Sequence, residues 1–395
     1  MPVPPGIVCD LDEYTRSLTD PSIFCLTRGD SIGLTITSEA GVISVLAFSS
    51  CSPSSLYRNA IRHIRRTGKC YIVQEPMDVL MLSLFVADLI QAIGAVMDAR
   101  WVHAGKVEVG AFCTAQGVVQ QLGETSVAIT TLMITVFTFV GVWWRKGLGA
   151  TFLAEILVGL AWLFVVLIVA IGNALHRSTH DLYESPTPYW CWIGQGYLGL
   201  RIWGEYVWFW ITLGFSSFAY LLLFLWARGN ITVSETSWWR FSVHRTSSTE
   251  VDRGQRRNSY TMIAYPVCYC ILVLPLSVVR WIGFVQDRGG RTGHTPPPAT
   301  FAVISIYGLS GALNVALLLN TRPNSILFGD GSGLTPAAGR APSPVNFERQ
   351  QGREDNLQLG RLPSASDHEN AWDLPRAKGV VHRHHDDDST VNVSV

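Results

Sequence analysis

Residues 152–171 read FLAEILVGLAWLFVVLIVAI, and Glu155 is the only charged side chain among them. A helix of about 20 mostly apolar residues is long enough to cross the hydrocarbon core of a bilayer. The rest of the chain has a similar character, because only 15% of its 395 residues are charged and the charges gather between long apolar blocks. A soluble domain usually carries about 25% charged residues. The sequence therefore predicts an all-α, polytopic membrane protein.

Five other stretches predict spans of the same kind, at residues 79–97, 117–143, 207–226, 262–279 and 301–319. A seventh candidate at residues 32–54 is weaker, because it is apolar only from 41 to 48 and then becomes small and polar. We predict a seven-transmembrane helix bundle that includes this first helix. A six-helix chain is the alternative.

Lys and Arg are shared unequally between the two sets of loops. The loops after the first, third and fifth spans carry more of them than the N-terminus and the opposite loops together. Cytoplasmic loops are enriched in these residues, so we predict an N-terminus outside, a cytoplasmic C-terminus and a plasma-membrane location. This topology requires an odd number of spans, which supports the first helix.

The predicted organisation has three parts. Residues 1–31 form an extracellular N-terminus, and residues 32–321 form the helical domain with a long inner loop at 227–259. Residues 322–395 are rich in Pro, Gly, Ser, Asp and Arg and poor in large apolar residues. Such a composition cannot bury enough surface to fold, and it predicts a disordered cytoplasmic tail.

Two cysteines lie where a bridge would join two outer segments. Cys113 precedes the third span, and Cys191 lies in the long loop before the fifth. The outer side is oxidising, so we predict a disulfide that ties this loop to the third helix. Two free thiols are the alternative. Cys9 and Cys25 offer a second pair in the N-terminus.

Three polar side chains fall near one depth in the predicted spans. With about 1.5 Å of rise per residue, Asp88, Glu124 and Asn314 lie near the middle of a core of about 30 Å. Gln91 and Gln121 are three residues from Asp88 and Glu124 and share their helix faces. We predict a buried polar layer that switches between two packings. Simple interhelical hydrogen bonding and a proton or cation path are the alternatives.

Aromatic residues crowd the outer end of the fifth span. They are Trp190, Trp192, Trp203, Tyr206, Trp208 and Trp210. Most are expected to form the belt of Trp and Tyr that lies at membrane surfaces, and some are candidates to line a ligand pocket. We also predict a ligand pocket among the outer ends of the spans. Its candidate residues are Gln120, Glu205, Arg280, Trp281 and Tyr307, and Arg280 is expected to be too shallow to need a buried partner.

Basic residues in the predicted inner loops are candidates to contact a cytoplasmic partner. They are Arg65, Arg66, Arg145, Lys146, Arg256 and Arg257. The last two precede Ser259 with a spacing that suits a basophilic kinase, and a phosphate there would change the charge of the loop. A chance occurrence of this short motif is the alternative.

Several classes of function are disfavoured by the sequence. The four lysines, Lys69, Lys106, Lys146 and Lys378, all lie outside the predicted spans. A retinal Schiff base needs a lysine amine, so an opsin-like photoreceptor is excluded. The sequence has no G-x-x-x-x-G-K-[ST] loop for nucleotide hydrolysis. We expect no enzymatic activity, no cofactor, no metal site and no nucleic-acid partner.

Motifs in four of the predicted spans are similar to those of one family. They are Ala87-Asp88-Leu89-Ile90-Gln91, Cys113-Thr114-Ala115-Gln116-Gly117, Gln121-Leu122-Gly123-Glu124, Tyr265-Pro266-Val267-Cys268-Tyr269, Leu272-Val273-Leu274-Pro275, Asn314-Val315 and Thr321-Arg322-Pro323. With these motifs, residues 33–323 resemble the fungal glucose-receptor-like and cAMP-receptor-like G-protein-coupled receptors.

The resemblance implies a partner and a ligand class. It implies a heterotrimeric G protein, contacted through Gα and acting toward adenylyl cyclase and cAMP, and an extracellular nutrient such as a sugar. It also implies the Cys113–Cys191 bridge. The Asp-Arg-Tyr signature of rhodopsin-like receptors is missing, because Trp143-Trp144-Arg145-Lys146 stands at its place. Two other functions remain open: a transporter or channel that uses the intramembrane carboxylates, and a seven-helix scaffold without G-protein coupling.

Overall fold

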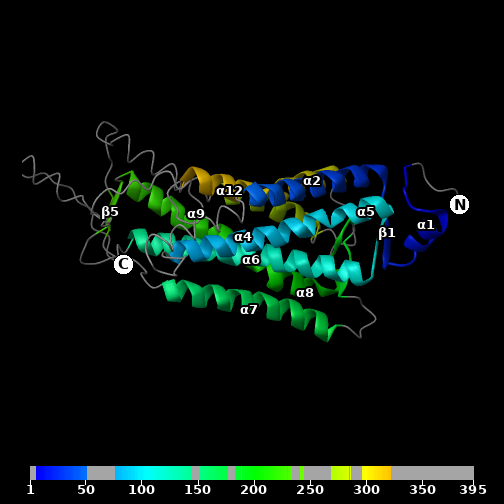
Figure 1. The fold of residues 1–395 in the computed structure, drawn as a ribbon, viewed down its shortest axis with the longest axis horizontal. Coiled ribbons are helices and arrows are strands. Elements are labelled where there is room, and N and C mark those ends of the chain that lie inside the picture. The colour runs from blue at the N-terminus through cyan, green and yellow to red at the C-terminus, as the bar shows by residue number, and fades with distance from the viewer. Residues whose placement is uncertain are drawn as a thin grey trace, which may run out of the picture. The chain divides into compact units, whose positions relative to one another are not determined.

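The computed structural model describes residues 6–50, 76–143, 151–176, 183–187, 189–228, 230–233, 241–243, 268–283, 285 and 296–321. These residues form a bundle of roughly parallel and antiparallel helices (Figure 1). Six helices are long and apolar enough to cross a membrane, and the shorter apolar helix Cys268–Gly283 joins them. The prediction of an all-α polytopic bundle is confirmed.

The spanning helices follow the predicted stretches. They are α2 (Arg28–Ser50), α4 (Pro76–Val96), α6 (Ala111–Trp143), α7 (Thr151–Leu175) and α9 (Val207–Ala227). The last span consists of two consecutive helices, α11 (Pro297–Gly308) and α12 (Ser310–Thr321). The predicted sixth span began at 262, and its first residues lie outside the described part of the chain.

The weak first span is a helix, and it begins four residues earlier than predicted. Thr27 and Asp30 explain the start. The Asp30 carboxylate accepts hydrogen bonds from the Thr27 backbone N–H at 3.0 Å and its hydroxyl at 2.7 Å, and the Asp30 N–H donates to that hydroxyl at 3.2 Å. This reciprocal capping satisfies backbone donors that an open helix end would leave unpaired. Residues 28–31 therefore belong to α2 rather than to a separate N-terminal segment.

Short elements gather at one end of the bundle, which we call the disulfide end. They are α1 (Leu11–Ser17), β1 (Ile23–Cys25), α5 (Asp98–Ala104), β2 (Lys106–Glu108), β3 (Glu184–Pro186) and β4 (Cys191–Ile193). Antiparallel pairs form between β1 and β2 and between β3 and β4. The predicted Cys113–Cys191 and Cys9–Cys25 bridges are both present, with Cα–Cα distances of 5.1 Å and 5.7 Å.

Three short helical segments lead from β4 into α9. They are the 3-10 helix Gln195–Tyr197 (η1), α8 (Leu198–Arg201) and the π-helical turn Ile202–Tyr206 (η2). The remaining pair of strands, β5 (Ile231–Val233) and β6 (Phe241–Val243), is antiparallel and follows α9. Figure 1 shows β5 at the opposite end of the bundle from β1.

Hydroxyl groups and a glycine hold the helices together. Trp162 on α7 donates to Ser83 on α4 at 3.0 Å, and the Thr212 hydroxyl on α9 donates to the Ala128 carbonyl on α6 at 3.0 Å. At Gly123 on α6, a Cβ would lie 2.5 Å from the backbone nitrogen of Gln91 on α4. Lipid supplies little hydrophobic force between spanning helices, so close packing and such polar bonds hold them together.

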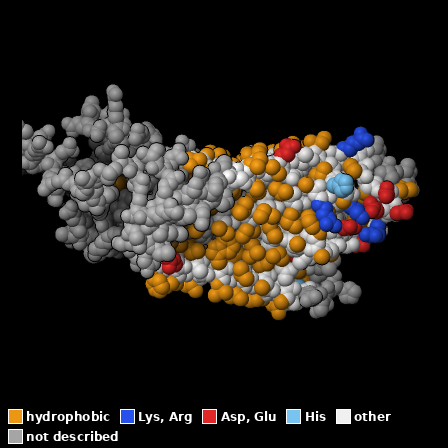
Figure 2. All heavy atoms as spheres, viewed as in Figure 1, with side chains coloured by type: hydrophobic (Ala, Val, Ile, Leu, Met, Phe, Trp, Pro, Cys, Tyr) orange, Lys and Arg blue, Asp and Glu red, His pale blue; other side chains and the backbone are white. Residues whose placement is uncertain are grey.

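The outward faces of the helices are apolar. In α7 only Ala154, Val165, Val169 and Gly172 are buried, whereas Phe152 is 70% exposed. Figure 2 shows hydrophobic side chains over the middle of the visible face and charged side chains gathered toward the disulfide end. An apolar band of this kind suits a lipid bilayer.

Candidate functional site

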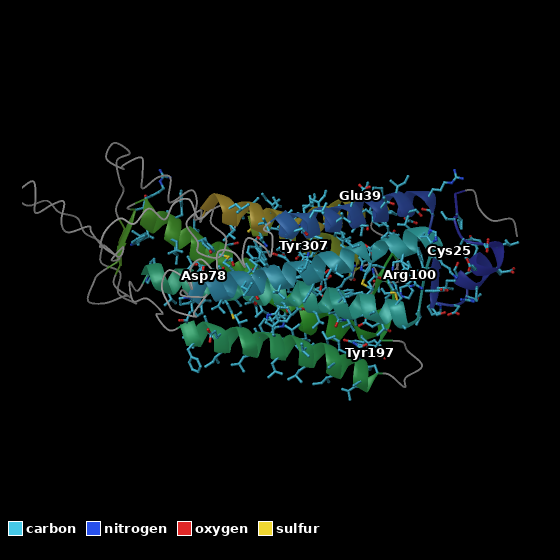
Figure 3. The ribbon with its side chains drawn as sticks, viewed as in Figure 1. Cys25, Glu39, Asp78, Arg100, Tyr197 and Tyr307 are labelled. Atoms are coloured by element: carbon cyan, nitrogen blue, oxygen red, sulfur yellow. A yellow bond between two sulfur atoms is a disulfide. The ribbon has the colours of Figure 1, made fainter. Side chains whose placement is uncertain are left out.

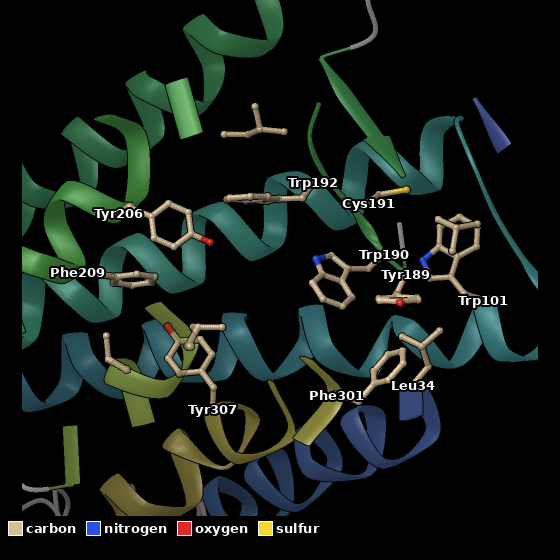
Figure 4. Packing of buried hydrophobic residues seen from close by; sticks show 14 of the residues in the cluster. Leu34, Trp101, Tyr189, Trp190, Cys191, Trp192, Tyr206, Phe209, Phe301 and Tyr307 are labelled. Atoms are coloured by element: carbon tan, nitrogen blue, oxygen red, sulfur yellow. The ribbon is translucent and has the colours of Figure 1, made fainter. Parts of the chain in front are cut away.

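A cavity lies inside the bundle toward the disulfide end, and we call it the polar cavity. It encloses about 480 Å³ of empty space, its open mouth included. Figure 4 shows Trp190, from the segment just before β4, together with Tyr206 and Tyr307 from two helical elements. The lining residues are Thr37, Gln91, Ala95, Asp98, Gln120, Glu124, Trp190, Tyr206, Leu276, Arg280, Ile304, Tyr307 and Gly308.

Gln116 fixes the chain segment that carries Trp190. Its side chain is fully buried, and its amide oxygen accepts bonds from the Cys191 N–H at 3.1 Å and the Trp101 indole at 2.7 Å. Its amide nitrogen donates to the Asp98 carboxylate at 2.7 Å. Together with the disulfide, these bonds attach β4 to α5 and α6. Trp190, next to Cys191, is thereby held as a wall of the polar cavity.

Carboxyl groups concentrate on one side of the polar cavity. Glu124 on α6 and Glu205 on the π-helical turn hydrogen-bond to each other, so the pair holds at least one proton. The Trp192 indole donates to Glu205 at 3.0 Å. Asp98 lines the same cavity and is close enough to Glu124 for their charges to interact. The extra residue of a π-helical turn is frequent at functional sites, and here it brings Glu205 inward.

Arg280 faces these carboxyls from the helix Cys268–Gly283. Its guanidinium carbon lies 4.8 Å from the ring centre of Trp190 and 5.2 Å from that of Trp192. The Nε atom is buried without a hydrogen-bond partner among the described residues. Arg280 was expected to be too shallow to need a buried partner; the residue is only partly buried, but its Nε atom is enclosed beside Trp190 and Trp192.

Two neutral polar atoms in the cavity wall are also left without partners. Gln91 is 5% exposed and Tyr307 is 4% exposed. The Gln91 side-chain oxygen and the Tyr307 hydroxyl have no hydrogen-bond partner in the described part of the chain. A buried polar atom that lacks a partner costs about 1–3 kcal/mol. The cavity thus presents groups that a polar molecule would satisfy.

Glu184 forms a separate buried carboxyl site beside the polar cavity. It is 3% exposed and accepts bonds from Gln121 at 3.3 Å and from Asn173 at 3.5 Å. It packs directly on Gly117, where a Cβ would overlap its carboxylate. Burial raises the pKa of the Glu184 carboxyl from 4.5 to about 8, so this group is largely protonated at neutral pH.

The predicted polar layer is divided between three places. Asp88 accepts hydrogen bonds from Asn314 at 2.8 Å and from Ser310 at 3.3 Å, which joins α4 to α12. Glu124 instead lines the polar cavity, and Gln121 reaches Glu184. Residues at the same depth in the bundle need not touch each other, because Gln121 and Glu124, three residues apart on α6, point toward different neighbours.

The last span is interrupted between α11 and α12, at Leu309. Side chains from other helices bind the backbone groups that this interruption frees. The Ser44 hydroxyl on α2 donates to the Gly308 carbonyl at 2.7 Å and accepts from the Ala312 N–H at 3.3 Å. Gln91 donates to the Tyr307 carbonyl at 3.4 Å. Broken spanning helices require such substitutes, since lipid offers none.

A second cavity lies farther from the disulfide end, and we call it the lower cavity. It encloses about 560 Å³ of empty space, and its lining includes Thr135, Ser216, Ser310 and Asn314. Tyr307 lines both cavities. Figure 3 shows Tyr307 between Arg100, toward the disulfide end, and Asp78, toward the other end.

The predicted pocket residues are not all in one place. Gln120, Arg280 and Tyr307 line the polar cavity, and Glu205 adjoins it through Glu124. Trp281 does not line this cavity: it is 45% exposed, and its ring centre lies 4.9 Å from that of Trp210 with the two rings tilted by 30°. The predicted partner-facing residues Arg65, Arg66, Arg145, Lys146, Arg256 and Arg257, the phosphorylation candidate Ser259 and the tail at 322–395 all lie outside the described residues.

The aromatic residues of this stretch divide between the two predicted places. Trp203 is 72% exposed, as a belt residue would be, whereas Trp190, Trp192 and Tyr206 are at most 4% exposed, and Trp190 and Tyr206 line the polar cavity. Asp98 and Ser44 were not anticipated as site residues. Asp98 offered one signal, since it is an acidic residue directly after an apolar span, whereas Ser44 offered none beyond being a serine in an apolar run.

Comparisons with known proteins leave this site as the guide to function. No family model matches the chain, and no curated protein matches its sequence.

Proposed function

We propose that the chain is a G-protein-coupled receptor. It binds an extracellular small molecule in the polar cavity and activates a heterotrimeric G protein through Gα, with cAMP signalling downstream. In this proposal the disulfide end faces outward in the plasma membrane and the C-terminus is cytoplasmic. The basic inner loops, which include Arg65, Arg66, Arg145 and Lys146, contact the G protein.

The position of Tyr307 is the observation that carries the proposal. Its hydroxyl is unpartnered in the wall of the polar cavity. Its ring also lines the lower cavity, and its own carbonyl is bound by Gln91 one residue before Gly308, where α11 ends. A ligand that engages the hydroxyl acts directly on the interrupted span. Contact at one end can therefore shift the population of two packings of α11 and α12.

Two further features support a receptor. Disulfides stabilise elements that face an oxidising space, and both described disulfides lie at the end that holds the polar cavity. The motifs of residues 33–323 resemble the fungal glucose-receptor-like and cAMP-receptor-like receptors, which favours a nutrient as the ligand.

A transporter or channel is the second candidate, because buried carboxyls occur at several levels of the bundle. Asp88, Asp98, Glu124 and Glu205 are all enclosed by helices, and such groups often mark proton or cation paths. Asp88 and Asp98, however, are engaged by amide or hydroxyl donors of the protein itself. This arrangement suits a packed receptor better than an open path.

The test uses the purified full-length chain in lipid nanodiscs with purified fungal Gα subunits. Nucleotide exchange on Gα is measured with and without receptor, and with a panel of sugars, amino acids and cyclic nucleotides. We expect the receptor to accelerate exchange on one class of Gα. No acceleration by folded receptor, together with solute or ion flux in proteoliposomes, would establish the transporter instead.

A further inference from the structure

We propose that the polar cavity binds a small zwitterion, a molecule that carries a primary ammonium and a carboxylate a few bonds apart, as a free amino acid does. The inference rests on the proposed receptor function and names the ligand class of that site. It follows from four properties of the cavity. One side is acidic, the single arginine of the described lining has an unpartnered Nε atom, two neutral polar groups lack hydrogen-bond partners among the described residues, and bulky side chains in the walls limit the size of the ligand.

The acidic side calls for a cation. Asp98 and Glu124 line the cavity, and Glu205 hydrogen-bonds to Glu124. With one proton shared by the glutamates, one negative charge remains on this pair, and the Asp98 carboxyl adds acceptor oxygens beside it. Both described ion pairs of the chain involve Lys106, outside the cavity. An ammonium group supplies three donors and a positive charge, and so it suits this side.

The basic side calls for an anion that approaches in one plane. Arg280 is the one basic residue in the described lining. Trp190 and Trp192 lie within cation–π distance of its guanidinium, so the rings occupy space around its faces. Its Nε is buried and unpartnered. The edge of a guanidinium carries donors in a fork that matches a carboxylate.

The unpartnered neutral groups are independent of these charges. Gln91 offers an acceptor and Tyr307 offers a hydroxyl, and both side chains are more than nine-tenths buried. The Gln91 oxygen can accept from the ligand ammonium, while the Tyr307 hydroxyl can donate to the carboxylate. A ligand without charge, such as a sugar, could use these two groups but would bring no charge of its own to the carboxyls or to Arg280.

The walls limit the size of the ligand. Trp190, Leu276 and Ile304 supply the apolar surface, and Ala95 and Gly308 are the small residues of the lining. Because the large side chains of Trp190, Leu276 and Ile304 occupy the walls, a short side chain on the zwitterion is expected. Binding should weaken as this side chain lengthens.

Binding can be measured without any G protein, so a failure of this inference is separate from a failure of the receptor function. The full-length protein in nanodiscs is titrated calorimetrically with L-alanine, propionate, ethylamine and glucose. The other proteinogenic amino acids, twenty in all, are titrated in the same way. We expect L-alanine or another small amino acid to bind. Propionate, which lacks the ammonium, and ethylamine, which lacks the carboxylate, should bind at least tenfold more weakly. Saturable glucose binding without amino-acid binding, or no binding by any of the twenty, would overturn the inference.

Variants then show which residue binds the carboxylate and which binds the ammonium of the ligand. Arg280→Gln should weaken amino-acid binding at least tenfold, and the variant should no longer bind the amino acid more tightly than ethylamine. Glu124→Gln should no longer bind the amino acid more tightly than propionate. Arg100→Gln, an exposed arginine near the same end, is the matched control and should bind as the unmodified protein does. Preferences unchanged in both cavity variants would overturn the assignment. The analogue series on the unmodified protein decides the ligand class even where a variant fails to fold.

Discussion

At the scale of single residues, Gly117 shows how closely β3 packs against α6. A Cβ at this position would overlap the Glu184 carboxylate. We expect Gly117→Ala to destabilise the protein by about 1–3 kcal/mol, the usual cost of overpacking, and to lower the thermal unfolding midpoint. Gly159→Ala on α7 is the control, because nothing lies within 4 Å of its Cβ. An equal midpoint for both variants would show that Glu184 moves aside freely.

Glu184 is also expected to make the stability of the folded protein depend on pH. Burial raises its pKa from 4.5 to about 8, so the folded protein holds this proton over a range in which the unfolded chain has lost it. The stabilisation is complete below about pH 4.5 and is lost as the pH rises through 8. Unfolding midpoints from pH 5 to 8 should fall less steeply for Glu184→Gln than for the unmodified protein. Parallel curves for the two proteins would contradict the assignment.

At the scale of elements, the interruption of the last span depends on a different helix. Ser44 binds both the Gly308 carbonyl and the Ala312 N–H. We expect Ser44→Ala to cost about 1–3 kcal/mol, because it leaves buried backbone groups unpaired. Ser49→Ala is the matched control, since that hydroxyl is exposed and binds only the Val45 carbonyl of its own helix. Hydrogen exchange at α12 amides should accelerate in the first variant alone.

In the proposed receptor, the junction between α4 and α12 would connect this interruption to signalling. Asp88 accepts from both Asn314 and Ser310, and an asparagine keeps only one acceptor oxygen. We therefore expect Asp88→Asn to change receptor-stimulated nucleotide exchange several-fold while the amount at the cell surface stays constant. Glu155→Gln, exposed on α7, serves as the comparison. A parallel loss of signalling and surface protein would reduce this junction to a structural role.

The elements also differ in how well the sequence predicted them. Long apolar runs predicted the spanning helices within a few residues, because bilayer thickness sets their length. The two helices of the last span and the inward position of Trp190 were not predicted. Each depends on a partner distant in sequence: Ser44 lies 264 residues from Gly308, and Gln116 lies 75 residues from Cys191. Local patterns carry no record of such contacts.

At the scale of the whole molecule, the described chain is fastened most firmly at the end that holds the polar cavity. Two disulfides, two strand pairs and the ion pairs of Lys106 with Glu13 at 2.6 Å and Glu108 at 2.9 Å all lie there. Phe24 of β1 meets Tyr189 edge to face at 5.9 Å, and Tyr189 meets Phe301 at 4.6 Å. The N-terminal segment thereby contributes to the same packed region as the cavity wall.

The Cys113–Cys191 bridge, which holds β4 in place, is expected to affect how long a ligand stays bound. Trp190 is a wall of the polar cavity, and the bridge and Gln116 hold its neighbour Cys191 in place. If the proposed ligand leaves past this wall, we expect its release to wait for the wall to move, so that the bound state outlasts the stimulus. After washout, bound ligand should persist longer on the intact protein than on Cys113→Ser/Cys191→Ser, and equal decay would show that the wall imposes no delay. A cell carrying such a receptor would retain a record of a recent encounter, and would have to end its response from the opposite side of the membrane.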